Sequence, residues 1–345
     1  MTHFYSFNNL MHDMFGGKVY RLSLSSGCTC PNRDGTLSKG GCIFCSAQGS
    51  GEFAAAASKD IAAQFEEAKA KVSNKIGKNT NFAGYMAYFQ SFTNTYGDTD
   101  ALAALFESAL SFPEMVSLSV ATRPDCLKED MVERLAKINR SKPVFVELGL
   151  QTIHEDTAAY INRRFAPEVF EDAFARLKER GIRVVVHVMT GLPGEDAQRT
   201  KETVKYLSEI EYKGEHIDGI KLALLYVLKG TRLAGLLPED IKILYASAGA
   251  DRPAGPDLPA CPDPPVCANP PVCADPPGYI ILKDGMVLPQ YSLYEYAALT
   301  AQLIHMLPEG CAVFRVSGDP PKKDLILPKW CADKKRVLNA IYAEY

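Results

Sequence analysis

Short apolar runs rich in β-branched and aromatic residues recur about every thirty residues, separated by stretches with helical periodicity. Alternation of this kind predicts a parallel sheet with right-handed crossovers. The predicted strands are Lys18–Ser25, Gly84–Gln90, Val116–Thr122, Val144–Gln151, Arg183–Thr190 and Gly219–Val227. The predicted helices between them are Lys59–Val72, Asp100–Ser111, Lys128–Ile138, Glu168–Arg180 and Asp196–Glu209, with capping residues such as Ser58 and Asp98 at their starts.

Six strand–helix units are too few for a closed eight-stranded barrel. We therefore predict an α/β fold, an open (β/α)6 partial TIM barrel over residues 1–235. In parallel α/β folds the chemistry gathers at the C-terminal ends of the strands. A cysteine-rich loop, residues 27–53, follows the first strand and is expected at that end.

Strand alternation places polar side chains on the inner face of this barrel. In the fourth strand Glu147, Gly149 and Gln151 share one face, while the apolar residues between them face the helices. The same rule groups further residues on the inner face: Ser117, Ser119, Ala121, Arg123, Met86, Tyr88 and Gln90. Such residues form either an internal hydrogen-bonded network or the lining of a polar ligand site. Contributions from three strands favour the ligand site.

The strand–helix pattern ends near residue 235. Residues 236–284 contain a proline-rich near-repeat that includes Cys261, Cys267 and Cys273, and we predict an extended insertion there. The regular cysteine spacing is also compatible with a second metal site, but repeat expansion produces such spacing by itself, which favours a solvated insertion. Residues 285–345 are predicted as a C-terminal extension that packs on the barrel, with a helix at Leu293–Leu307, a strand at Ala312–Val316 and a helix at Ala332–Tyr345.

Composition is that of a globular protein, with 47% apolar and 23% charged residues. No apolar run has the length of a membrane span, and the N-terminal sequence lacks the pattern of a signal peptide. We therefore expect a cytoplasmic protein that does not contact a membrane. The ten cysteines are then reduced thiols that serve as ligands, catalysts or buried side chains. The net charge of −3 means that a nucleic acid would need a local basic patch.

Three cysteines of the loop, Cys30, Cys42 and Cys45, have the spacing C-x11-C-x2-C, and Cys28 lies two residues upstream. Three thiolates can hold a [4Fe–4S] cluster that leaves one iron open to a chelating small molecule. Four thiolates, including Cys28, could instead form a structural zinc site. Phe44, between the last two cysteines, could pack against a flat base beside a cluster. Spacing alone leaves the cluster and the zinc site both open.

Longer sequence blocks carry a resemblance to a known family. Nine blocks occur in the following order: KVYRLSL, GCTCPNRDG, GGCIFCSAQGSGEF, AYFQSFTNTY, SVATRPDCL, ELGLQTIHEDTAAYINRRF, VMTGLPGE, IKLALLYVLKGTRLA and FRVSGDPPKKDLILPKW. They resemble the radical S-adenosylmethionine (radical SAM) proteins of the YtqA/YhcC-like family, relatives of the radical SAM domain of the Elongator catalytic subunit. The resemblance covers nearly the whole chain apart from the proline-rich segment.

The resemblance implies a radical SAM enzyme with two cofactors, a [4Fe–4S] cluster and S-adenosyl-L-methionine. It assigns Cys30, Cys42 and Cys45 to the cluster, and the position of Cys28 is usually aromatic in such proteins. It also assigns Gln90 to the methionyl amino group, Glu147 and Gln151 to the ribose and carboxylate, and the turn containing Gly191 and Pro193 to the adenine. A one-electron donor of the flavodoxin or ferredoxin type would reduce the cluster, and cleavage of S-adenosylmethionine would give a 5′-deoxyadenosyl radical. No catalytic side chain is assigned beyond these residues.

The substrate is the least determined part of the prediction. The relatives suggest modification of a tRNA wobble-uridine side chain, and a small metabolite or a peptide is the alternative. A basic C-terminal region near Trp330 could hold phosphate and stack a base, or it could be an ordinary solvated helix face. Residues 162–164 are a second candidate basic spot. The basic C-terminal region contains Lys322, Lys323, Lys329, Lys334, Lys335 and Arg336.

Overall fold

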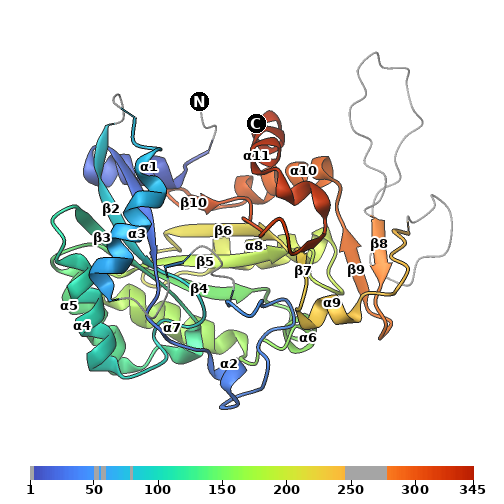
Figure 1. Ribbon diagram of the computed structural model, residues 1–345, viewed down its shortest axis with the longest axis horizontal. Helices are drawn as coiled ribbons and strands as arrows, with labels where there is room; N and C mark the ends of the chain where they lie inside the picture. The colour runs from blue at the N-terminus through green and yellow to red at the C-terminus, as the bar shows by residue number, and fades with distance from the viewer. Residues whose placement is uncertain (1–3, 50–53, 56–59, 78–80, 245–277) are drawn as a thin grey trace.

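The computed structural model describes residues 4–49, 54–55, 60–77, 81–244 and 278–345. Its centre is a parallel seven-stranded sheet that curls into a half-barrel (Figure 1). The strand order is β1-β2-β3-β4-β5-β6-β10. The strands are β1 (Lys18–Leu24), β2 (Phe82–Phe89), β3 (Met115–Thr122), β4 (Val144–Gln151), β5 (Arg183–Thr190), β6 (Gly219–Leu224) and β10 (Ala312–Arg315). The predicted α/β partial barrel is therefore confirmed.

The half-barrel has one strand more than the six predicted. β10 belongs to the C-terminal extension and pairs in parallel with β6, with Ala312 opposite Gly219 and Val313 opposite Ile220. Without β10, the outer edge of β6 would present unpaired backbone donors and acceptors. The prediction missed this pairing because residues far apart in sequence form it.

Helices cover the outer face of the sheet and the sheet edges (Figure 1). The crossover helices pack their apolar sides on the strands, and Asp98 caps α4 as predicted by accepting from the amide of Ala101. Asp60 caps α3, while Ser58 lies outside the described residues. The helices are α1 (Phe7–Phe15), α2 (Pro31–Asp34), α3 (Ile61–Ser73), α4 (Thr99–Leu110), α5 (Glu129–Asn139), α6 (Glu155–Tyr160), α7 (Pro167–Glu179), α8 (Ala197–Glu209), α9 (Arg232–Leu236), α10 (Leu293–His305) and α11 (Lys334–Ala343).

The two faces of the sheet differ as the alternation predicted. Val146, Leu148 and Leu150 of β4 are fully buried in the main hydrophobic core beneath the helices. A separate apolar cluster that includes Met11, Met86 and Phe314 fills the half-barrel and packs under the polar part of its interior. The lumen is thus apolar below and polar towards the C-terminal ends of β2, β3 and β4.

Two short antiparallel pairs lie outside the main sheet. β7 (Val227–Leu228) pairs with β11 (Leu325–Leu327), which ties the C-terminal extension to the barrel. β8 (Gly278–Ile281) pairs with β9 (Val287–Gln290), so the last part of the segment predicted as an insertion forms a strand. Cys261, Cys267 and Cys273 lie outside the described residues. In the described ranges, no helix combines the length and apolar character that crossing a membrane requires.

Candidate active site

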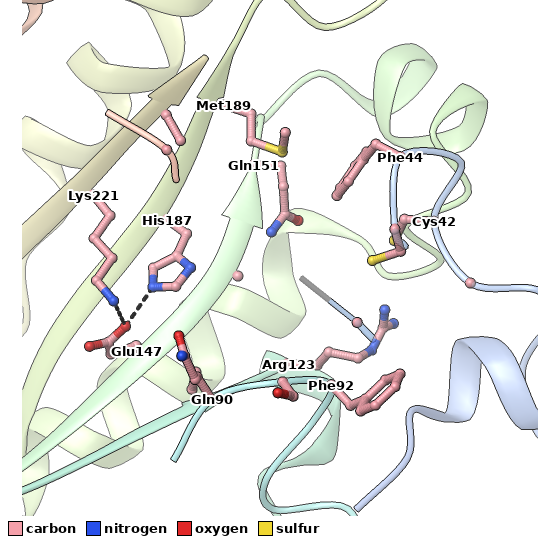
Figure 2. Close-up of a pocket in the computed structure, with 18 of the residues that line it drawn as sticks. Cys42, Phe44, Gln90, Phe92, Arg123, Glu147, Gln151, His187, Met189 and Lys221 are labelled. Atoms are coloured by element: carbon pink, nitrogen blue, oxygen red, sulfur yellow. Dashed lines mark hydrogen bonds and ion pairs between the residues drawn. The ribbon is translucent and has the colours of Figure 1, made fainter. Parts of the chain in front are cut away.

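A cavity of about 270 Å³ opens at the C-terminal ends of the strands, where the parallel fold predicts a site. Every strand of the half-barrel from β2 to β6 contributes to its lining, and the cysteine loop covers one end (Figure 2). Seven of the predicted site residues are brought together here: Cys30, Cys42, Cys45, Phe44, Gln90, Glu147 and Gln151. Gly191 and Pro193 lie outside the lining; Gly191 instead adjoins Leu224 and Tyr291.

The cysteine loop is shaped by its own backbone and by the segment that follows α6. Cys30 precedes α2 at its N-terminus, and Gly40 and Gly41 take left-handed conformations with φ of 84° and 79°. The side chain of Asn162 donates to the carbonyl of Gly41 at 2.8 Å, and the carbonyl of Asn162 accepts from Asn32 at 2.5 Å. These contacts place the loop over the mouth of the half-barrel.

Residues 162–164 therefore do not form a wholly exposed basic spot, and Asn162 instead holds the cysteine loop. Arg163 is only 1% exposed, and it donates to the carbonyls of Leu150 and Phe165, both at 2.8 Å, and of Thr152. The prediction of a basic spot at this position is wrong for Arg163, because its side chain is buried and its two terminal nitrogens donate to backbone carbonyls. Only Arg164 of the two arginines is exposed.

The three lining thiols lie in a partly cationic environment. The neighbouring Cys45 thiol and burial raise the pKa of Cys42 well above its usual value, and the guanidinium of Arg123 opposes this rise. Arg123 is buried and is held by Asp125, with nitrogen–oxygen distances of 2.9 and 2.7 Å. Positive charge at this point favours thiolate over thiol, and thiolate is the form that binds metal.

Cys28 is separated from the other three cysteines. It lies outside the cavity lining and packs against the main core, and a Cβ atom added to Gly97 would stand 3.7 Å from its sulfur. Burial raises the pKa of its thiol. Zinc needs four ligands around one ion at about 2.3 Å, whereas a cluster offers each thiolate a different iron. Among the described residues, no group of three or more His, Cys, Asp or Glu side chains is arranged to hold a single metal ion.

The opposite end of the cavity carries a buried ionic cluster (Figure 2). Glu147 is fully buried, and its carboxylate accepts from Ser119 at 2.7 Å, from His187 Nε2 at 2.7 Å and from the ammonium of Lys221. Lys221 also donates to the hydroxyl of Tyr88 at 2.9 Å. Because a carboxylate only accepts, we assign the proton of His187 to Nε2. The internal network weighed as an alternative for Glu147 is therefore present, inside the same cavity as the thiols.

Burial and charge oppose each other in this cluster. Burial would raise the pKa of Glu147, but Lys221 and His187 outweigh it and hold that pKa well below its usual range. Burial lowers the pKa of Lys221 to about 7, although Glu147 acts in the opposite direction. Burial and the charge of Lys221 also lower the pKa of His187. Glu147 is thus ionised, His187 is neutral, and Lys221 can change its charge near neutral pH.

Sequence reasoning missed several lining residues. His187, Met189 and Lys221 were not singled out, and Arg123 was placed on the inner face without a role. A signal was available, because His187 and Lys221 interrupt the otherwise apolar runs of β5 and β6. Phe92 and Arg315 gave no signal, since a loop and a distant strand bring them to the cavity.

The basic C-terminal region combines a packed tryptophan with exposed lysines. Trp330 is half-buried; its indole N–H donates to the carbonyl of Tyr291 at 3.1 Å, and its ring lies 5.7 Å from that of Tyr296. It is therefore engaged in packing. The lysines around it are exposed, and four of them line a hollow of about 790 Å³ that also includes three carboxylates. These lysines are Lys322, Lys323, Lys334 and Lys335.

Comparison with known proteins agrees with this geometry. The family model of the radical SAM superfamily matches residues 27–207, more than half of the chain, and the Radical_SAM C-terminal domain matches residues 283–345. The chain therefore belongs to the radical SAM superfamily, a group of enzymes. Its similarity to the protein YtqA of Bacillus subtilis places it in the YtqA/YhcC-like family: the two are 34% identical over 99% of this chain and 89% of that protein.

Other relatives match more locally. Protein YhcC of Escherichia coli is 33% identical over 64% of this chain and 67% of its own length. A tRNA uridine(34) acetyltransferase of Methanocaldococcus jannaschii is 32% identical over 34% of this chain and 21% of its own length. The solved structure of the archaeal Methanocaldococcus infernus Elp3 superposes with a TM-score of 0.55 at 14% identity, covering 89% of this chain and 58% of that one. At this identity the last match shows the fold alone.

Proposed function

We propose that this radical SAM enzyme binds a [4Fe–4S] cluster through Cys30, Cys42 and Cys45 and uses it to cleave S-adenosylmethionine reductively. The observation that carries the proposal is the shared cavity, which three thiols line at one end while Cys28 stays outside. The residues fit the cluster chemically, since three sulfur donors line one cavity, the Arg123 guanidinium lies near Cys30 and Cys42, and the glycines of the loop allow a close backbone approach.

Gln90, Gln151 and Phe44 are our candidates for S-adenosylmethionine contacts, because all three line the cavity that the thiols share. Glu147 reaches the same cavity, but Ser119, His187 and Lys221 already engage its carboxylate, so it would contact a ligand as part of that network. Gly191 and Pro193 remain a prediction from resemblance. When bound and reduced by a flavodoxin- or ferredoxin-type donor, the cluster and cofactor supply a 5′-deoxyadenosyl radical for hydrogen abstraction.

Anaerobic reconstitution tests this first proposal. The protein should turn brown and hold about four irons per chain, the stoichiometry of the cluster. Addition of dithionite should then release 5′-deoxyadenosine from S-adenosylmethionine. A colourless protein with one zinc and no turnover of S-adenosylmethionine would contradict the proposal.

For the substrate, we propose a tRNA wobble-uridine side chain. The partial similarity to a tRNA uridine(34) acetyltransferase supports it, as do the exposed lysines beside Gly318, a residue shared by the cavity and the lysine-lined hollow. Nucleoside mass spectrometry of tRNA from a deletion strain tests it. An accumulated wobble-uridine precursor supports the proposal, whereas an unchanged nucleoside profile points to a small metabolite or a peptide instead.

A further inference from the structure

The two edges of the half-barrel face each other across a cationic gap. β1 and β10 are the end strands of the sheet, and α1 packs against both of them. A hollow of about 510 Å³ is lined from both edges. Five basic side chains and a single carboxylate, Asp319, belong to its lining, in a chain whose net charge is −3. The five are Arg21, Lys71, Lys75, Arg315 and Lys334.

This gap adjoins the candidate active site. Gln90, Tyr226 and Arg315 line both the hollow and the cavity that holds the thiols. A molecule seated in the gap would therefore extend directly into the half-barrel interior. The gap is also the open side of the half-barrel, because β1 and β10 are end strands that do not pair with each other.

One hydrogen-bond donor of Arg21 has no acceptor among the described residues at this position. One of its terminal nitrogens donates to the carbonyl of Phe314 at 2.9 Å, and its guanidinium lies 4.2 Å from the centre of the Phe7 ring. The other terminal nitrogen, Nη1, is buried and has no hydrogen-bond partner in the described part of the chain. Buried donors are normally satisfied, so an unfilled one next to a hollow indicates a missing acceptor.

The charges around Arg21 indicate that the acceptor is an anion. Arg315 approaches from the opposite edge. Burial lowers the pKa of Arg21 and this second guanidinium acts in the same direction, while the Glu147 carboxylate partly opposes them. Asp319 is already shared by Lys334 at 2.7 Å and Arg315 at 3.6 Å. No carboxylate of the described residues forms an ion pair with Arg21. Two arginines without a full set of counter-charges match the forked recognition of phosphate.

We propose that the gap between β1 and β10 binds a phosphate group of the substrate between Arg21 and Arg315. The reacting part of the substrate would extend past Gln90 and Tyr226 into the cavity. This inference deepens the proposed function and rests on it, because it takes the cavity as the reaction chamber. The phosphate could belong to a small metabolite or to a nucleic-acid backbone, and the experiment separates the two.

Calorimetry tests the proposal. It measures the binding of two probes, ribose 5-phosphate and a twelve-nucleotide RNA, to the reconstituted protein in the presence of S-adenosylmethionine. Arg315→Gln should weaken the better probe about tenfold or more, since hydrogen bonds to charged groups are strong. Arg21→Lys keeps the charge but removes the fork, and it should also weaken binding. The matched control is Arg134→Gln, an equal charge change on the outer surface of α5, where Arg134 pairs with Asp100.

The RNA and sugar-phosphate arms identify the source of the phosphate. A nucleic acid is supported if RNA binds more tightly than ribose 5-phosphate and its affinity falls with salt as steeply as several phosphate contacts require. Lys75→Gln should then make this salt dependence less steep. Binding of ribose 5-phosphate without tighter RNA binding supports a metabolite. The proposal is overturned if neither probe binds, or if both arginine variants bind as the wild type does while the cluster absorbance and the thermal midpoint show intact protein. Failure of the radical chemistry is a separate result, because it is read from 5′-deoxyadenosine release by the wild type.

Discussion

Lys221 of β6 contacts the carboxylate of Glu147 on β4 across the intervening strand β5, from which His187 reaches the same carboxylate. Both members of the pair are buried. Transferring two charges into a protein interior is unfavourable, and their mutual attraction offsets this only while both are present. Removal of one partner should therefore be more harmful than removal of both.

Lys221→Met should destabilise the protein by about 3–5 kcal/mol at pH 6, because it leaves the Glu147 carboxylate without its cation. Urea unfolding measures this difference. Lys229→Met is the matched control, since Lys229 is exposed and its replacement should change the free energy of unfolding by less than about 0.5 kcal/mol. In the double variant Glu147→Gln/Lys221→Met, the loss should be smaller than the sum of the two single losses. Additive losses would show that the two side chains are not coupled.

The low pKa of Lys221 makes stability depend on pH in a defined direction. In the folded protein this pKa is about 7, whereas the lysine of an unfolded chain titrates near its ordinary value of 10.5. Between these values the unfolded state binds the extra proton, so the free energy of unfolding should rise with pH, by at most about 1.4 kcal/mol per pH unit. Urea unfolding from pH 7.5 to 9.5 should show this slope in the wild type and its loss in Lys221→Met. Equal slopes in both proteins would contradict the assignment.

The cysteines should divide into two groups by iron content. Cys42→Ala removes a proposed ligand, so the reconstituted protein should lose most of its about four irons and its brown colour. Cys28→Ala is the matched control, since Cys28 lies outside the cavity, and it should retain the iron. Iron analysis and visible absorbance measure both. Equal iron loss in the two variants would favour four ligands over three.

The contact between Asn162 and the cysteine loop gives a fourth prediction. Asn162 has a φ of 60°, and its side chain donates to the carbonyl of Gly41. Asn162→Gly accepts this backbone conformation but removes the hydrogen bond, so we expect faster loss of iron to a chelator with little change in the thermal midpoint. Asn139→Gly, which removes side-chain hydrogen bonds to Gly181 and Val144 outside the loop, is the control. Equal rates of iron loss in the wild type and Asn162→Gly would exclude a positioning role.

The sequence predicted the barrel well because local periodicity determines which face of each strand is polar. Glu147 and Gln151 were placed in the lumen by alternation alone, and the structure confirms their position. Long-range pairing is invisible to such reasoning, so the addition of β10 was missed, as was the arrival of Arg315 in the cavity. Arg163 was misjudged for a related reason. An arginine that satisfies buried carbonyls has the same sequence signature as one on the surface.

The last prediction concerns Gly149, the residue between Glu147 and Gln151 on the inner face of β4. A Cβ atom at Gly149 would lie 2.8 Å from the end of the Gln151 side chain, too close for the present arrangement. Gln151 is the flexible partner, so Gly149→Ala should fold normally but displace the amide of Gln151 from its place in the cavity. If Gln151 contacts S-adenosylmethionine, binding of the cofactor should weaken about tenfold, the loss of a hydrogen bond to a charged group.

Equilibrium dialysis with S-adenosylmethionine measures this affinity, and thermal unfolding measures the stability. Gly181→Ala serves as the control for a glycine-to-alanine change away from the cavity, although its φ of 64° makes some loss of stability expected there. Gln151→Ala should reproduce the weaker binding of Gly149→Ala, and the double variant should bind no worse than either single variant, because both changes act through the same amide. If Gln151→Ala binds S-adenosylmethionine as tightly as the wild type does, Gln151 is not a cofactor contact.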